Sequence, residues 1–230
     1  MTPRIIVSYD DTHNDRDALA LGHLLASGGA ELSLAYVRHA QQSDREREAL
    51  EEREAEALLD HGSQLLGAPD VPRHVIVHAS TGDGLRELAL REQADIVVFG
   101  SDYRTAPGAV APGVSAQRLL NGGPAAVSIA PADFRSQLPH RVSRVNILED
   151  GDAAATETAR SLAASLGAET AADEDDHGDL LVVSSTEGGQ PGRVTLSASA
   201  EYELETATVP VLAVARGKAV RFPARSYIEA

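Results

Sequence analysis

The sequence predicts an α/β fold with a doubly wound parallel sheet, arranged as a tandem repeat whose second unit is degenerate. Three observations predict this. Short apolar runs alternate with segments of helical period, the layout of the first half returns in the second half, and the second copy is shorter. The chain has 230 residues, 43% of them hydrophobic, which is enough to build a sizeable core.

Five apolar runs in the first half have the character of strands that are buried on both faces. They are six or seven residues long and nearly continuous in apolarity. Because strands and helices alternate, we expect right-handed crossovers and a first domain over residues 1–135. The expected strands cover residues 4–10, 32–37, 74–79, 95–100 and 125–130.

The segments between these runs have helical period. The first places Ala18 and Leu21 on one apolar face and stops at "SGG" (27–29). The second begins at the cap "SDRE" (43–46) and continues to Leu65, and the third is a short helix that follows Thr81.

After a connector at 131–143 the pattern begins again. "RVNILEDGDAAATETARSLAASLG" repeats the layout of "RIIVSYDDTHNDRDALALGHLLASGG", and "GDLLVVSSTEGGQPG" echoes "ADIVVFGSDYRTAPG". Between Leu166 and Asp179 there is room for one weak strand, so counterparts of the second helix, third strand and third helix are expected to be missing. We therefore predict a shortened second domain over 143–217 and a tail over 218–230.

The two units are expected to join through their fifth strands, at 125–130 and 211–215. Each strand would then cover an edge that could otherwise recruit another chain. This predicts an intramolecular pseudo-dimer.

Composition excludes several classes of function. The chain has no cysteine, which excludes disulfides, thiolate metal sites and thiol nucleophiles. A net charge of −15 and only 3% aromatic residues oppose nucleic acid and membranes as partners. With neither a long apolar run nor a leader-like start in "MTPRIIVSYDD", we expect a soluble, cytoplasmic protein.

No metal or catalytic motif stands out. His74 and His78 lie in one expected strand, about 13 Å apart, which is too far to share a zinc ion. The acidic run at 173–179 begins like a calcium loop, but its twelfth place is Ser184, in an expected strand, where a glutamate is needed. No Walker loop, Gly-x-Gly-x-x-Gly or nucleophile–base pair occurs, so we expect no metal site and no catalytic residues.

Asp10 and Asp11 end the first expected strand. Such a pair holds Mg²⁺ in response-regulator receiver domains, but the further aspartate and lysine of that chemistry are missing here. Another interpretation is structural, with one carboxylate capping the helix near residues 12–15.

"IIVSYDDT", "ELSLAYV" and "ADIVVFGS" resemble strands of the universal stress protein family, and the layout resembles its tandem members. The resemblance implies an adenine nucleotide alpha hydrolase-like fold with strand order 3-2-1-4-5. It also implies adenine near the acidic end of strand 1 and the backbone at the end of strand 2, which fall on Asp10 and Val37. Members that bind ATP hold its phosphates on a loop of pattern Gly-x2-Gly-x9-Gly-Ser/Thr.

That loop falls here on Gly100, Tyr103, Gly113 and Val114. Tyr103 replaces a glycine and Val114 replaces a hydroxyl residue, although serines are nearby. The resemblance implies weak binding of ATP or AMP by the first half. The expected site residues are Asp10, Val37, Gly100, Ser101, Gly113 and Ser115.

The function that follows is a stress-response regulatory protein, with ATP hydrolysis very slow or absent. The alternative is a nucleotide-free scaffold or interaction module of the same fold, which Tyr103 and Val114 favour. The second half carries Glu187 beside its loop glycines and lacks the segments that would wall an adenine pocket. It is expected to bind no nucleotide.

Overall fold

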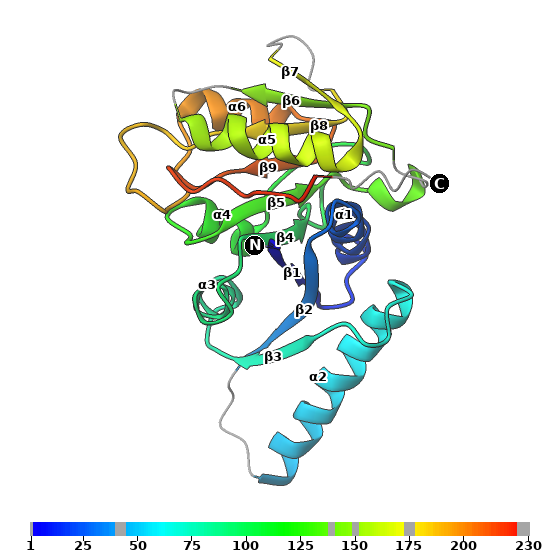
Figure 1. Ribbon diagram of the computed structural model, residues 1–230. Coiled ribbons are helices and arrows are strands. Elements are labelled where there is room, and N and C mark those ends of the chain that lie inside the picture. Colours follow the sequence, from blue (N-terminus) through cyan, green and yellow to red (C-terminus); the bar gives the residue numbers. More distant parts are fainter. Residues whose placement is uncertain (1, 40–44, 138–140, 149–151, 173–177, 225–230) are drawn as a thin grey trace.

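The strands of the first half join those of the second half in one continuous sheet (Figure 1). The computed structural model describes residues 2–39, 45–137, 141–148, 152–172 and 178–224. Within these residues the sheet has nine strands in the order β3-β2-β1-β4-β5-β9-β8-β6-β7. The strands are β1 (Arg4–Ser8), β2 (Glu31–Arg38), β3 (Arg73–Val77), β4 (Ile96–Gly100), β5 (Ala126–Ala130), β6 (Arg144–Leu148), β7 (Glu169–Ala171), β8 (Leu180–Val183) and β9 (Val211–Ala213).

Helices cover both faces of the sheet, because successive strand residues point to opposite sides and both sides are apolar. Ile5 and Val7 pack in one buried cluster with α1, α2 and α5, whereas Ile6 packs in the other with α3, α4 and α6. The elements are α1 (Asp15–Ser27), α2 (Arg45–Leu65), α3 (Thr81–Arg91), α4 (Val114–Leu120), the 3-10 turn η1 (Phe134–Gln137), α5 (Ala153–Leu166) and α6 (Ala198–Thr206).

The halves meet where β5 pairs with β9, and this is the one antiparallel pairing in the described part of the sheet. Ser128 faces Leu212 at its centre, with Val127 opposite Ala213 and Ile129 opposite Val211. The prediction that the two fifth strands pair within the chain is confirmed. The order β3-β2-β1-β4-β5 is also the order that the resemblance implies.

Hydrogen bonds around this junction occur in pairs, one in each half. Ser101, just after β4, donates its hydroxyl to the carbonyl of Ala130, and Ser185, after β8, donates to Val214, both at 2.7 Å. Backbone hydrogen bonds of the two loops correspond in the same way. The N–H of Gly108 donates to Ala132 as that of Gly192 does to Arg216, and the N–H of Val110 donates to Ala207 as that of Val194 does to Gly123. Each residue and its equivalent in the other half are separated by the same number of positions along the chain.

The second half is the shorter one. β7 is the single strand described between Leu166 and Asp179, and it forms an edge of the sheet beside β6. In the described residues no helix lies between β7 and β8, whereas α2, β3 and α3 lie between β2 and β4 in the first half. Most of the acidic run 173–179 lies outside the described residues. Ser184, expected inside a strand, instead follows the end of β8.

The helix boundaries follow local chemistry. α1 stops at Gly28 and Gly29, where Gly29 has φ +89°, a conformation that glycine adopts without strain. The expected cap of α2 at Ser43 lies outside the described residues. After β9, Val220 and Phe222 return to the core formed by α1 and α5.

Candidate functional site

The candidate site lies at the carboxyl ends of β1, β2 and β4. β1 pairs with β2 on one side and with β4 on the other, so the connections leaving β1 and β4 start side by side. In open parallel sheets, ligands bind outside the carboxyl ends of the strands where the strand order reverses, which is here between β1 and β4. The structure therefore brings Asp10 and Gly100 to the same edge.

Gly100 is in close contact with the connection between β1 and α1. A Cβ on Gly100 would lie 2.1 Å from the backbone oxygen of Asn14. Asn14 is buried, and its Nδ2 donates to the carbonyls of Ser101 at 2.9 Å and Asp102 at 2.8 Å. Glycine at position 100 is thus required for packing. Sequence reasoning missed Asn14, since nothing in "DTHND" marks it as the joint between the two connections.

Ser101 is buried, and its hydroxyl is used within the loop. Its Oγ donates to the carbonyl of Ala130 and accepts from the backbone N–H of Ala111 at 3.2 Å. Ser101 also forms an isolated antiparallel bridge with Pro112, and the N–H of Asp102 donates to the carbonyl of Ala111. The loop after β4 is therefore folded back on itself.

Gly113 and Ser115 lie where this loop enters α4. Gly113 is the N-cap residue and makes no side-chain cap, and a Cβ on it would meet only Asp102 Oδ2, at 3.9 Å. The first amide groups of a helix have no partner within it, so this corner offers N–H donors. α4 has only seven residues, and Val114 is 84% exposed at its start.

The two residues that depart from the family pattern both face solvent. Tyr103 is 71% exposed, and the guanidinium carbon of Arg104 lies 4.9 Å from the centroid of its ring. Together with Val114, Tyr103 gives the loop an apolar surface. A phosphate-binding loop would present glycine and a hydroxyl group at these places.

Asp10 and Val37 occupy the expected adenine side. Partial desolvation, followed by the charges of Asp15 and Asp11, raises the pKa of Asp10 to about 6. The side chain of Val37 is buried against Gly84, where a Cβ would lie 3.0 Å from Val37 Cγ1. Val37 could therefore contribute only backbone groups.

The carboxylates after β1 do not cap α1. Its N-cap residue is Asn14, which makes no side-chain cap, and Asp15 Oδ2 accepts the N–H groups of Asp10 at 3.0 Å and Thr12 at 3.1 Å. Asp11 has φ +57° and accepts the Tyr9 hydroxyl at 2.7 Å. Burial, with this hydrogen bond as a second cause, raises the pKa of Tyr9. The capping interpretation of Asp10 and Asp11 is therefore wrong.

The histidines near this edge have local contacts. His78 Nδ1 accepts the N–H of Ser80 at 3.1 Å, and His39 Nε2 lies 3.4 Å from Thr81 Oγ1. His74 lies at the opposite end of β3, and burial lowers its pKa. Throughout the described ranges, no three histidine or acidic side chains are grouped so that they could hold a metal ion.

The comparisons with known proteins agree with this fold. The family model described as "Universal stress protein family" matches residues 1–131, and the chain belongs to this family. None of the curated proteins matches the chain. Of the helices in the described residues, none is long and apolar enough to span a membrane.

Two solved structures are similar over nearly the whole chain. A universal stress protein from Archaeoglobus fulgidus DSM 4304 is 14% identical with a TM-score of 0.63, over 93% of this chain and 96% of that one. A putative universal stress protein from Pseudomonas aeruginosa UCBPP-PA14 is also 14% identical, with a TM-score of 0.61 over 93% of each chain. At this identity the likeness concerns the fold alone.

Proposed function

We propose that this protein is a tandem universal stress protein with a shortened second copy, and that its first half binds ATP or AMP weakly as a regulatory signal in the cytoplasm. Membership of the universal stress protein family supports the class of protein that we propose. The paired hydrogen bonds around β5 and β9, with counterparts at constant separation, support the tandem interpretation.

The observation that best supports nucleotide binding is that a hydrogen-bond acceptor for adenine and N–H donors for phosphate lie at the same edge of the sheet. Asp10 lies at the end of β1, where its carboxylate can accept a hydrogen bond from the amino group of adenine. The backbone of Val37 lies near the end of the neighbouring strand, β2. The open corner at Gly113 and Ser115 supplies N–H groups toward the phosphates. We expect the nucleotide to be bound with hydrolysis very slow or absent.

The same geometry keeps the proposed affinity low. The hydroxyl of Ser101 is already bonded twice, and Asp102 places a carboxylate near Gly113. Each added phosphate brings more negative charge toward Asp102, so we expect AMP to bind at least as well as ATP. Asp102→Asn should improve AMP binding by about 0.5 to 1 kcal/mol, because solvent screens part of the repulsion.

The second candidate function is a nucleotide-free scaffold or protein-interaction module. The exposure of Tyr103 and Val114 on the same loop favours it, because exposed apolar side chains suit a protein partner better than a phosphate. In this case the loop would act only as a connection between β4 and α4.

Calorimetric titration with AMP and ATP distinguishes the two. Gly113→Asp adds bulk and negative charge at the open corner and should abolish binding. Gly188→Asp is the matched control, because a Cβ on Gly188 in the corresponding loop of the second half meets nothing within 4 Å. If the wild type gives no heat at millimolar nucleotide, or if Gly113→Asp binds as the control does, the scaffold function stands.

A further inference from the structure

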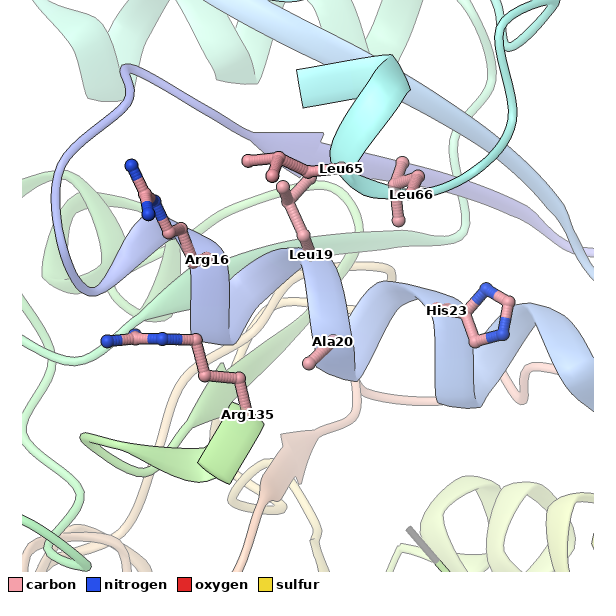
Figure 2. Close-up of a pocket in the computed structure, with 7 residues that line it drawn as sticks. All are labelled: Arg16, Leu19, Ala20, His23, Leu65, Leu66 and Arg135. Carbon is pink, nitrogen blue, oxygen red and sulfur yellow. The ribbon is translucent and has the colours of Figure 1, made fainter. Parts of the chain in front are cut away.

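A concave surface lies against α1, and its arginine end is close to Asp11. It is a groove of about 460 Å³ between α1, the end of α2 and η1 (Figure 2). One wall is formed by residues of α1 that are spaced as on one face of a helix. The other wall is formed by the end of α2, the turn after it and one arginine of η1. The lining residues are Arg16, Leu19, Ala20, His23, Leu65, Leu66 and Arg135.

The middle of the groove is apolar. Leu19 and Ala20 form its floor on α1, and Leu65 and Leu66 stand above them (Figure 2). Leu65 is 48% exposed, so water covers a large part of an aliphatic side chain that belongs to a concave surface. An apolar ligand would remove this surface from water, at about 25 cal/mol per Å².

The polar groups of the groove are cationic or neutral, and its wall contains no carboxylate. Arg16 and Arg135 lie at one end, and His23 lies at the other (Figure 2). This distribution is unusual for a chain with 35 acidic and 20 basic residues. The carboxylates that contact these two arginines, Asp11 and Asp17, are not among the lining residues of the groove.

The two arginines differ in their contacts within the protein. Arg135 is held in place, because its Nη1 donates to the backbone oxygen of His13 at 2.7 Å and to Asp17 Oδ1 at 3.1 Å. No hydrogen bond of the Arg16 side chain is described in the part of the chain that the structure covers, but its Nη2 forms an ion pair with Asp11 Oδ1 at 3.6 Å, between two partly exposed side chains. A ligand carboxylate would compete with Asp11 for the Arg16 guanidinium, in the same groove as an arginine that Asp17 and His13 hold in place.

We propose that this groove binds a free fatty acid of medium chain length, with the carboxylate at Arg16 and Arg135 and the acyl chain along Leu19 and Leu65. The apolar stretch of α1 from Arg16 to His23 is about 10 Å long at 1.5 Å per residue, which suits such a chain. The net charge of −15 repels anions at long range, so an anion needs apolar contact to bind here. This favours a single carboxylate on an alkyl chain over a phosphate or a nucleotide.

The test titrates the full-length protein with decanoate below its micelle concentration, with decanol as the uncharged analogue. Decanoate should bind with one molecule per chain and about tenfold more tightly than decanol, as expected for a hydrogen bond to a charged group. Arg16→Gln should remove this preference by weakening decanoate about tenfold while leaving decanol unchanged. Arg53→Gln, an exposed arginine of α2 outside the groove, is the control and should bind as the wild type does.

The apolar contact has its own matched pair. Leu65→Gln should weaken both ligands about fivefold, through the aliphatic area that is no longer covered. Leu50 lies on the same helix and is 50% exposed, compared with 48% for Leu65, but it is outside the groove. Leu50→Gln should therefore change neither affinity. Both leucines are half exposed, so both variants should fold, and unfolding midpoints equal to that of the wild type check this.

Four results would overturn the proposal. One is the absence of decanoate binding, and another is equal binding of decanoate and decanol. The third is an equal effect of Leu65→Gln and Leu50→Gln. A protein that forms dimers through this groove would also overturn it, and sedimentation of the wild type and Leu65→Gln over a range of concentrations detects that occupant.

Discussion

The backbone oxygen of Asn14 lies 2.1 Å from the place where a Cβ on Gly100 would stand. Contacts of this length between a Cβ and a backbone oxygen do not occur in folded proteins, so one of the two connections must move if any side chain is added. The same connections are joined by the amide group of Asn14, which holds Ser101 and Asp102. The end of β4 therefore has glycine for a reason that applies with or without a ligand.

Gly100→Ala should destabilise the protein by about 3 kcal/mol or more, because the backbone oxygen of Asn14 is held by the N–H groups of Asp17 and Ala18 and cannot move without breaking these hydrogen bonds. Gly188→Ala is the control, since its Cβ would meet nothing within 4 Å. Urea denaturation of both variants measures the difference in unfolding free energy. If Gly100→Ala were as stable as Gly188→Ala, the close approach to Asn14 would not be a constraint.

The fold could be predicted largely from the sequence, because its signals are local or repeated. Apolar runs marked β1, β4 and β5, and recurrence of the layout indicated that β9 would serve as a second fifth strand. The site was predicted less well. Whether the Ser101 hydroxyl is available depends on the loop folding back to Ala111, and the amide of Asn14 reaches a residue 87 positions away. Neither contact has a signature in residue spacing.

The groove on α1 escaped sequence reasoning for the same reason. Arg135 lies in the connector and Asp17 in α1, 118 positions apart, yet they are bonded in the structure. In the sequence, Arg16 and His23 look like ordinary solvent-facing positions of an amphipathic helix. Only the position of η1 and of the end of α2 turns that face into a concave surface.

The first charge-related prediction concerns Asp17. Its carboxylate is fully buried and accepts three hydrogen bonds, from the N–H groups of Asp133 and Arg135 and from the Arg135 side chain. Asp17→Asn keeps the shape but leaves the guanidinium without its counter-charge, and it should cost about 3 kcal/mol of stability. Asp60→Asn removes an exposed ion pair with Arg73 and should cost less than about 1 kcal/mol.

Thermal or urea unfolding of both variants tests this comparison. Equal stability of Asp17→Asn and Asp60→Asn would contradict a structural role for Asp17 in fixing the connector to α1. A loss of stability in Asp17→Asn alone would show that the attachment of η1 to α1 depends on this carboxylate.

Asp10 should make stability depend on pH. Its pKa is raised from 3.8 to about 6 in the folded protein, so the charged form is disfavoured by folding. The resulting penalty is absent below the unfolded pKa, develops as pH rises between about 4 and 6, and is complete above 6. Asp10→Asn removes it and should stabilise the protein at pH 7.5 by about 1 kcal/mol, a value reduced because solvent screens this partly exposed carboxyl.

Urea denaturation at pH 7.5 and pH 4 checks the sign. The gain from Asp10→Asn should be present at pH 7.5 and should be much smaller at pH 4, where folded Asp10 is protonated and unfolded Asp10 is near the midpoint of its titration. A gain of equal size at both pH values would mean that the charge of Asp10 is not its cause.

The last prediction concerns the edge that β9 covers. In the full chain, β5 has β4 on one side and β9 on the other, and Ser128 faces Leu212 at the centre of the antiparallel pairing. A fragment of residues 1–137 keeps β1 to β5 but leaves the outer edge of β5 uncovered. Val127 and Ile129, which are buried in the full chain, belong to this strand. Because an uncovered strand edge recruits another strand, the fragment should form a two-fold dimer with β5 against β5.

Sedimentation of the fragment against the full chain tests this, with far-ultraviolet circular dichroism to establish that the fragment is folded. The full chain should stay a monomer at concentrations where the fragment is dimeric, since its own β9 occupies the edge. A folded fragment that stays monomeric at high micromolar concentration would contradict the prediction. It would mean that β9 contributes apolar packing to the sheet without being needed to protect its edge.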